Sequence, residues 1–201
     1  MLDNASARQV LSGIVTPVAK CLIRLRVSAD AVTVFGAIAT IACAVVFVPS
    51  GHFLIASLTI GLLSLSDLLD GTMARLTKSD SRWGAFLDST LDRVVDAAVL
   101  ISISAYFLSA MGKDDKALAA TAVALVMGQM TSYIRAKAES LDVQCKVGLA
   151  ERAERTLIVW IALLVSGLGW FCLSGAMYLL ALITTLTVIQ RVAHVRKQLN
   201  T

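Results

Sequence analysis

Four aspartates near the middle of the chain have the spacing that metal-assisted chemistry on a phosphate requires. The segment SDLLDGTMARLTKSDSRWGAFLDSTLDRVVDAA contains D-x-x-D-G-x-x-A-R followed by G-x-x-x-D-x-x-x-D. Spacings of three (Asp67, Asp70) and four (Asp88, Asp92) return each pair of carboxylates to one face of a helix. Clustered carboxylates repel one another unless cations compensate, and hard oxygen donors favour Mg2+ or Mn2+. The pattern therefore predicts a divalent-metal site facing a phosphate-bearing substrate.

Small residues and one arginine accompany these carboxylates. Gly71 and Gly84 have no side chain and allow a ligand or a neighbouring helix to approach the backbone. Ala74 keeps the same surface small, and Arg75 can hold phosphate oxygens with two parallel hydrogen bonds. A purely structural alternative is that the aspartates pair with arginines to stabilise a helix bundle. Ionisable residues in apolar helices are costly and usually functional, so the whole pattern favours a site.

Composition indicates that the helices carrying this motif lie in lipid. The 201-residue chain is 57% hydrophobic and only 16% charged, and its mean hydropathy is +0.78. A soluble domain carries about 25% charged residues. The chain has too little polar surface to cover a globule of this size. We therefore expect one all-α membrane domain over residues 1–201, with an N-terminal segment at 1–29 and a helix bundle at 30–197.

Six apolar stretches separated by turn signals approach the length that crosses a bilayer. Helices are expected because backbone exposed to lipid must satisfy its own hydrogen bonds. The sequence thus predicts a polytopic membrane protein with six transmembrane helices. The six stretches are residues 31–49, 53–69, 94–111, 117–134, 156–172 and 174–190.

Lysine and arginine are distributed unequally between the two ends of these spans. With a cytoplasmic N-terminus, 16 of the 18 basic residues fall on the cytoplasmic side, and only Lys113 and Lys116 fall outside. The positive-inside rule then places both termini and the acidic motif on the cytoplasmic side of the cell membrane. The net charge of +4 lies at helix ends rather than in an aromatic-rich soluble patch. Membrane lipids or a phosphorylated substrate are therefore expected as partners, and nucleic acid is not.

The N-terminal segment is predicted to form a short interfacial amphipathic helix. Thr16 and Pro17 have the residue types of a helix cap and first helical position, and the following VAKCLIRLRV mixes apolar residues with Lys20, Arg24 and Arg26. No cleaved signal peptide is expected, because MLDNASARQV lacks a basic start followed directly by an apolar core. The cysteines and histidines are isolated in the sequence and predict neither a disulfide framework nor a zinc site.

The acidic motif, with all eight specified positions present, resembles the signature of the CDP-alcohol phosphotransferase family. The resemblance implies a six-helix membrane fold, usually a homodimer, that displaces CMP from a CDP-linked lipid by an alcohol. It implies that Asp67, Asp70 and Asp88 are metal ligands, and that Asp92 is both a ligand and the general base. It also implies that a further set of residues borders CDP-diacylglycerol, namely Asp30, Ala31, Val32, Thr33, Gly71, Ala74, Arg75 and Ser81.

The reaction expected at this site is attack of a neutral hydroxyl on a negatively charged diphosphate. Two ions of Mg2+, or of Mn2+, can neutralise that charge and stabilise the leaving CMP. Asp92 would remove the hydroxyl proton. We expect direct in-line displacement, because no separate nucleophile with an adjacent base is evident. Asp96, one turn beyond Asp92, lies outside the signature and is expected to have a supporting structural role.

Basic residues at the ends of the last three spans are candidates for binding an acceptor that carries its own phosphate. Alternatively, these side chains only mark helix ends, with Glu151 and Glu154 as ion-pair partners. The segments SYIRAKAES and AERAERTLIVW resemble those of actinobacterial phosphatidylinositol-phosphate synthases, which implies inositol 1-phosphate as the acceptor. Glycerol 3-phosphate is the nearest alternative. The candidate acceptor residues are Ser132, Arg135, Lys137, Arg152, Arg155 and Arg191.

Two other classes of protein also place charges in apolar helices. A small transporter would have its charges near the midplane and paired broken helices, whereas here the carboxylates gather at one membrane face. An enzyme acting on a prenyl diphosphate also needs clustered aspartates, but it does not account for the spacing of glycine, alanine and arginine.

Overall fold

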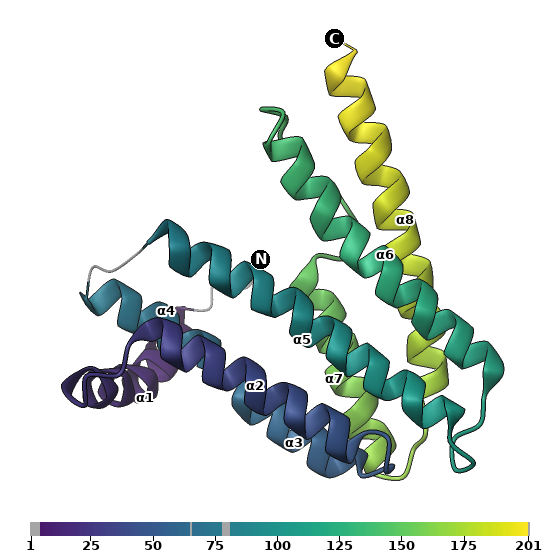
Figure 1. The fold of residues 1–201 in the computed structure, drawn as a ribbon, viewed down its shortest axis with the longest axis horizontal. Helices are drawn as coiled ribbons and strands as arrows, with labels where there is room; N and C mark the ends of the chain where they lie inside the picture. Colours follow the sequence, from purple (N-terminus) through teal and green to yellow (C-terminus); the bar gives the residue numbers. More distant parts are fainter. Residues whose placement is uncertain (1–4, 65, 78–80, 201) are drawn as a thin grey trace. The chain divides into compact units, whose positions relative to one another are not determined.

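The computed structural model describes residues 5–64, 66–77 and 81–200, without the side chains of residues 5–14 and of Asp67. The described residues form helices and connecting turns, with no strand among them, so the predicted all-α class is confirmed (Figure 1). In chain order the helices are α1 (Ala5–Arg24), α2 (Ala29–Phe47), α3 (Phe53–Leu63), α4 (Ser66–Thr77), α5 (Arg82–Leu108), α6 (Asp115–Glu139), α7 (Arg152–Gly167) and α8 (Leu173–Leu199).

Within the described residues, four segments are long and apolar enough to cross a membrane: α2, Phe53–Thr77, α6 and α8. They correspond to four of the six predicted spans. The last 18 residues of α5 fall short because they include Asp92, Arg93 and Asp96. Helix α7 has 16 residues, about 24 Å of helix against about 30 Å of hydrocarbon. The chain is a membrane protein by its apolar helices, and the six-span count stays a prediction.

Several helix ends differ from those predicted. Helix α1 begins at Ala5, and Pro17 lies inside it, so the expected start at Thr16 is wrong. Proline favours the first turn of a helix but also occurs in the interior, where it removes one backbone hydrogen bond. Helix α5 begins at Arg82, well before the predicted span at residue 94. Hydropathy detects only the apolar part of a helix, whereas backbone hydrogen bonding continues through the polar motif.

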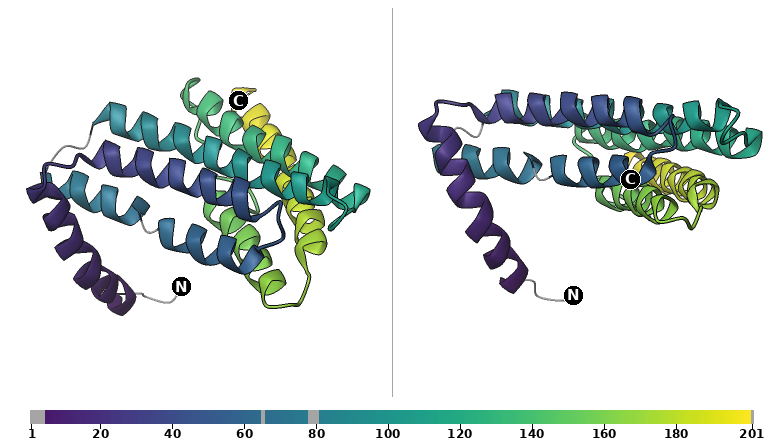
Figure 2. Two further views of the ribbon diagram at one scale, coloured as in Figure 1. Left: turned by 60° about the horizontal axis from the view of Figure 1, so that its bottom comes forward. Right: turned by 90° about the horizontal axis from the view of Figure 1, so that it is seen from below.

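The helices divide into two compact units, and each is described by itself. The first contains the described residues up to Ala42 together with Thr59–Val95. In this unit α1 packs against α4, and Gly36 of α2 lies directly against the side chain of Ser66 at the start of α4. Figure 2 shows α4 and the first part of α5 running in opposite directions. This unit carries the whole acidic motif.

The second unit contains Cys43–Leu58 and the chain from Asp96 onward. Here α8 packs along α6 and also contacts α7 (Figure 1). The indole Nε1 of Trp160 on α7 donates to the carbonyl of Ser57 on α3 at 2.8 Å. The last residue of α7, Gly167, lies against the backbone of Leu54. These contacts fix α7 between its neighbours in this unit.

Asp114 links the beginnings of α6 and α8. Its side chain accepts a hydrogen bond from the backbone N–H of Ala117 at 3.0 Å and another from the hydroxyl of Ser174 at 2.9 Å. The first bond is that of a helix N-cap. Both bonds favour the ionised carboxylate, the Ala117 bond most, and they hold the pKa of Asp114 below its ordinary value of 3.8.

The connection between α6 and α7, residues 140–151, lies along one face of α8. The Nε2 of Gln198 donates to the carbonyl of Gln144 at 3.0 Å, and the Nε of Arg191 donates to the carbonyl of Val147 at 2.8 Å. The backbone N–H of Ala150 lies 3.4 Å from the hydroxyl oxygen of Thr187. Since these three α8 residues are spaced by four and seven, they share one face of the helix.

Glycine allows this connection to lie close to α8. Gly148 has a φ of +138°, and a Cβ there would lie 2.5 Å from the methyl group of Thr187 and 3.4 Å from the Nε of Arg191. A side chain at this position would meet both an unfavourable backbone conformation and occupied space. The α6–α7 connection therefore packs directly against α8 beside Arg191.

Candidate active site

The acidic motif lies on two helices of the first unit, with Asp67 and Asp70 on α4 and Asp88 and Asp92 on α5. The side chain of Asp67 lies outside the described residues. The Asp88 side chain is exposed, and that of Asp92 is 15% exposed. Among the side chains that the structure describes, no three carboxylate, imidazole or thiol groups are placed to share a metal ion. The four-aspartate metal site therefore stays a prediction.

Asp70 contacts a residue that the sequence placed beside the nucleotide. The hydroxyl of Thr33 on α2 lies 2.5 Å from Asp70 Oδ2 and 3.1 Å from the carbonyl of Ala29. Its single proton is best given to the carboxylate, since hydrogen bonds to charged groups are shorter and stronger. Thr33 thus orients a predicted metal ligand, a role that the sequence analysis missed.

Asp30 and Ser81 are brought together by a glycine of the motif. A Cβ on Gly84 would lie 3.3 Å from the hydroxyl oxygen of Ser81 and 3.5 Å from Asp30 Oδ1. The backbone N–H of Gly84 donates to the same Ser81 oxygen at 2.9 Å, which is the bond of an N-terminal helix cap. Gly84 therefore allows the start of α2 to approach the start of α5.

The arginine and the other glycine of the motif lie at an open part of α4. Arg75 is exposed, and its Nε donates to the carbonyl of Gly71 at 3.0 Å. A Cβ added to Gly71 would meet only the terminal nitrogen of Arg75, at 4.0 Å. Space is therefore present on this side of the helix, as the motif predicted. The remaining predicted nucleotide residues lie on α2 (Ala31, Val32) and α4 (Ala74) of the same unit.

Asp92 has a basic neighbour in its own helix. The Nη1 of Arg93 lies 3.9 Å from Asp92 Oδ2 and also bonds to the hydroxyl of Ser89 at 2.9 Å. A carboxylate can accept a proton, and the role of Asp92 as the base stays a prediction.

The six candidate acceptor residues all belong to the second unit. Arg191 on α8 is 3% exposed. Its Nε donates to the carbonyl of Val147, and its Nη1 donates to the carbonyl of Thr131 on α6 at 2.5 Å. Among the described residues no carboxylate forms an ion pair with it. Arg191 is therefore a buried cation held by backbone carbonyls, and not a helix-end side chain reaching for water.

Arg155 is buried in the same unit and is held at both ends of its guanidinium. Its Nη1 donates to the hydroxyl of Thr131 at 2.8 Å, and its Nη2 lies 3.7 Å from Asp96 Oδ2. The Nε of Arg152 lies 3.7 Å from the other carboxylate oxygen of Asp96. Asp96 thus joins α5 to two arginines of α7, which matches the supporting role expected of it.

The three remaining candidates lie at the end of α6. The Nε of Arg135 donates to Glu139 at 3.1 Å, whereas Glu151 and Glu154 were the partners suggested by the sequence. Lys137 is exposed and Ser132 is partly buried. Of the candidate set, the structure therefore brings Arg155 and Arg191 together on one residue, Thr131. The sequence analysis did not select Thr131, although a threonine buried in an apolar helix is itself a signal of a hydrogen-bonded partner.

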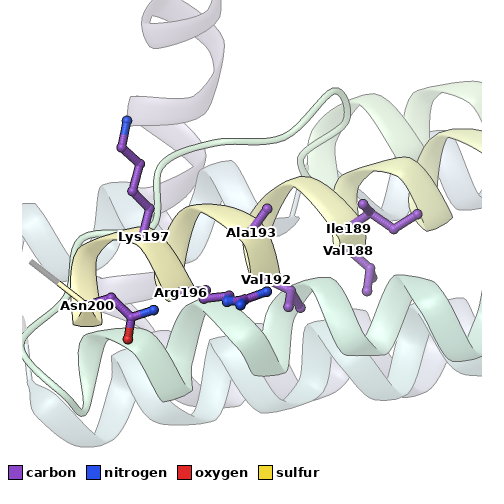
Figure 3. A pocket seen from close by; sticks show the side chains of 7 residues that line it. All are labelled: Val188, Ile189, Val192, Ala193, Arg196, Lys197 and Asn200. Atoms are coloured by element: carbon purple, nitrogen blue, oxygen red, sulfur yellow. The ribbon is translucent and has the colours of Figure 1, made fainter.

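A shallow depression lies elsewhere, along the C-terminal half of α8 (Figure 3). Its wall is largely apolar, and two basic residues follow near its end. No predicted site residue lines it. This surface is of the kind that a lipid-facing helix presents near the membrane interface. The lining residues are Val188, Ile189, Val192, Ala193, Arg196, Lys197 and Asn200.

Comparison with known proteins gives one consistent result. The model of the family described as CDP-alcohol phosphatidyltransferase matches residues 26–189. Over 204 residues the chain is 42% identical to a phosphatidylinositol phosphate synthase of Streptomyces avermitilis, covering 97% of this chain and 83% of that protein.

Solved structures of a Mycobacterium tuberculosis phosphatidylinositol phosphate synthase share the fold. The form with CDP-DAG bound has a TM-score of 0.86 and 35% identity, covering 90% of this chain and 93% of the other. The form in complex with manganese and citrate has the same TM-score and identity, covering 90% and 88%. The chain is therefore similar to these proteins over nearly its whole length.

Proposed function

The chain belongs to the CDP-alcohol phosphatidyltransferase family, and from this premise we propose that it transfers the phosphatidyl group of CDP-diacylglycerol to inositol 1-phosphate. CMP is released and phosphatidylinositol phosphate is formed. The observation that carries the acceptor assignment is the buried pair of arginines, Arg155 and Arg191, held on Thr131. Arg191 is a buried cation that forms no ion pair with the carboxylates that the structure describes. Such a cation is costly until an anion approaches it, which favours an acceptor bearing a phosphate.

Asp67, Asp70, Asp88 and Asp92 would hold divalent metal, which we assign as two ions of Mg2+ or Mn2+. The carboxylate oxygens are the donors that these hard cations prefer, and the hydroxyl of Thr33 fixes the orientation of one of them. Manganese is present in one structure of the similar mycobacterial enzyme. When bound, the ions supply neutralisation of the diphosphate charge and stabilisation of the leaving CMP.

The side chains of the motif also accept the proton and bind the nucleotide. Asp92 accepts the proton of the attacking hydroxyl, and Arg93 lies beside it. Arg75, Gly71 and Ala74 on α4 border the diphosphate and nucleotide, where the open space around Gly71 leaves room for them. Asp30, Ser81 and the start of α2 complete that border.

The acceptor phosphate is bound by Arg155 and Arg191, with Arg152, Arg135, Lys137 and Ser132 contributing charge and hydrogen bonds. The planar guanidinium is suited to phosphate because it offers parallel N–H groups. We further propose six spans, an interfacial N-terminal helix, cytoplasmic placement of the termini and active site, and a homodimer. The 16-to-2 distribution of basic residues supports the sidedness.

An acceptor panel tests the function. The purified protein is assayed in mixed micelles with CDP-diacylglycerol and Mg2+, and CMP release is measured with inositol 1-phosphate, inositol, glycerol 3-phosphate and serine. We expect release that depends on metal and is fastest with inositol 1-phosphate. Preference for glycerol 3-phosphate would replace the acceptor, preference for an unphosphorylated alcohol would remove the role of the arginines, and ion flux in liposomes without CMP release would overturn the reaction class.

A further inference from the structure

Thr131 receives hydrogen bonds from two different helices. It is fully buried on α6, and its hydroxyl accepts from Arg155 of α7 at 2.8 Å. Its carbonyl accepts from Arg191 of α8 at 2.5 Å. The hydroxyl also donates to the carbonyl of Gly128 at 2.7 Å, which leaves its lone pairs directed at the guanidinium. One threonine therefore contacts both buried arginines of the candidate acceptor site.

These bonds fix the planes of both guanidinium groups. Arg191 is held at Nε by the carbonyl of Val147 and at Nη1 by the carbonyl of Thr131, and two fixed nitrogens define its plane. Arg155 is held at Nη1 by the Thr131 hydroxyl, and its Nη2 lies near Asp96. Thr131 is therefore the residue that bonds to both Arg155 and Arg191. Arg155 also passes beside Gly128, one turn earlier on α6, where a Cβ would be in ordinary contact with its Nε at 3.9 Å.

We propose that Thr131 is a positioning residue that orients Arg155 and Arg191 for the phosphate of the acceptor; this inference rests on the function proposed above. Both guanidinium groups are directed before the acceptor arrives, so less of the binding free energy is lost in ordering them. Thr131 itself does not touch the reacting atoms. Its effect is therefore expected on acceptor binding and much less on the chemical step.

Removal of the hydroxyl isolates this role. Thr131→Val keeps the shape of the side chain and the carbonyl bond to Arg191, but it leaves Arg155 without its hydroxyl acceptor. We expect KM for inositol 1-phosphate to rise roughly tenfold, as for loss of a hydrogen bond to a charged group. The kcat and the KM for CDP-diacylglycerol should change less than about twofold, and Thr131→Ser, which keeps the hydroxyl, should restore the acceptor KM.

Thr121→Val is the matched control. Thr121 is also fully buried on α6, and its hydroxyl bonds to the carbonyl of Ala117 in its own helix. It is not part of the candidate site, so this variant measures the general cost of removing a buried hydroxyl from α6. If Thr131→Val does not fold, Thr131→Ala provides a second variant without the hydroxyl, and thermal unfolding in detergent shows which variants are folded.

The outcomes separate this inference from the proposed function. An acceptor KM for Thr131→Val equal to that of Thr121→Val, or no rescue by Thr131→Ser, overturns the positioning role. If the wild-type protein prefers glycerol 3-phosphate, the proposed acceptor is wrong, and the same rise in KM is then expected for glycerol 3-phosphate because both acceptors carry a phosphate. An unchanged KM for whichever phosphorylated acceptor the wild type uses also overturns the inference.

Discussion

Replacement of Thr33 tests whether this residue serves the metal or the nucleotide. The sequence placed Thr33 at the CDP-diacylglycerol site, but its hydroxyl lies 2.5 Å from Asp70 Oδ2. A hydrogen bond to a charged group contributes about 1.5–3 kcal/mol, which corresponds to roughly 10- to 100-fold in a binding constant. The Thr33–Asp70 hydrogen bond can form in both the metal-free and the metal-bound protein. Its loss therefore weakens metal binding only by the free energy needed to orient the Asp70 carboxylate toward the metal. We therefore expect Thr33→Val to weaken Mn2+ binding by about tenfold, the lower end of that range.

The assay is direct titration of the detergent-solubilised protein with Mn2+, followed by the electron paramagnetic resonance signal of the free ion. Thr40→Val is the control, because Thr40 lies on the same helix and its hydroxyl bonds to the carbonyl of Gly36 at 2.8 Å. Thr33→Ser should bind Mn2+ like the wild-type protein. If Thr33→Val binds Mn2+ as tightly as Thr40→Val while its KM for CDP-diacylglycerol rises, Thr33 is a substrate contact and the reasoning from the Asp70 distance is refuted.

Three further predictions concern other parts of the molecule. Asp92→Asn removes the proton acceptor, so CMP release should fall by about 100-fold or more; near-normal release would exclude Asp92 as the base. Gly167→Ala forces a Cβ against the Leu54 backbone and should lower the free energy of unfolding by about 1–3 kcal/mol. In Gly175→Ala the added Cβ meets nothing within 4 Å, and the free energy of unfolding should rise by about 0.5–1 kcal/mol. Equal thermal midpoints for the two variants would contradict this prediction. The lowered pKa of Asp114 means that the contribution of its charge to stability is complete above pH 3.8 and is lost as the pH falls through the folded-state pKa. Asparagine can still accept the N-cap hydrogen bond but carries no charge, so the thermal midpoint of Asp114→Asn should approach that of the wild type only in acid. A constant difference down to that range would count against a contribution of the charge.

The helices and the motif were accessible to prediction because both depend on local patterns. Apolar runs identified α2 within two residues at each end and the starts of α6 and α8, but α8 continues to Leu199, nine residues past the predicted end. The spacing of the aspartates placed the pairs on two helices. Hydropathy did not indicate that α5 extends back to Arg82.

The partners of the arginines were not accessible in the same way. Arg191 was selected from the sequence by its charge and its place near a helix end, but its hydrogen-bond acceptors are main-chain carbonyls of Val147 and Thr131. Every residue has such a carbonyl, so residue type carries no information about which one is used. Asp96 was expected to have a supporting role, but its pairing with two arginines of α7 depends on how α5 and α7 pack.

The attachment of the α6–α7 connection to α8 limits how this part of the chain can change length. Gln144, Val147 and Ala150 are bonded to residues at fixed intervals along a helix, so the connection is in register with α8 in the way that one strand is in register with another. An added or deleted residue would displace the carbonyl of Val147 from Arg191 and could not be absorbed as in an ordinary surface loop. This connection is therefore expected to tolerate substitution of its exposed side chains but not a change of length.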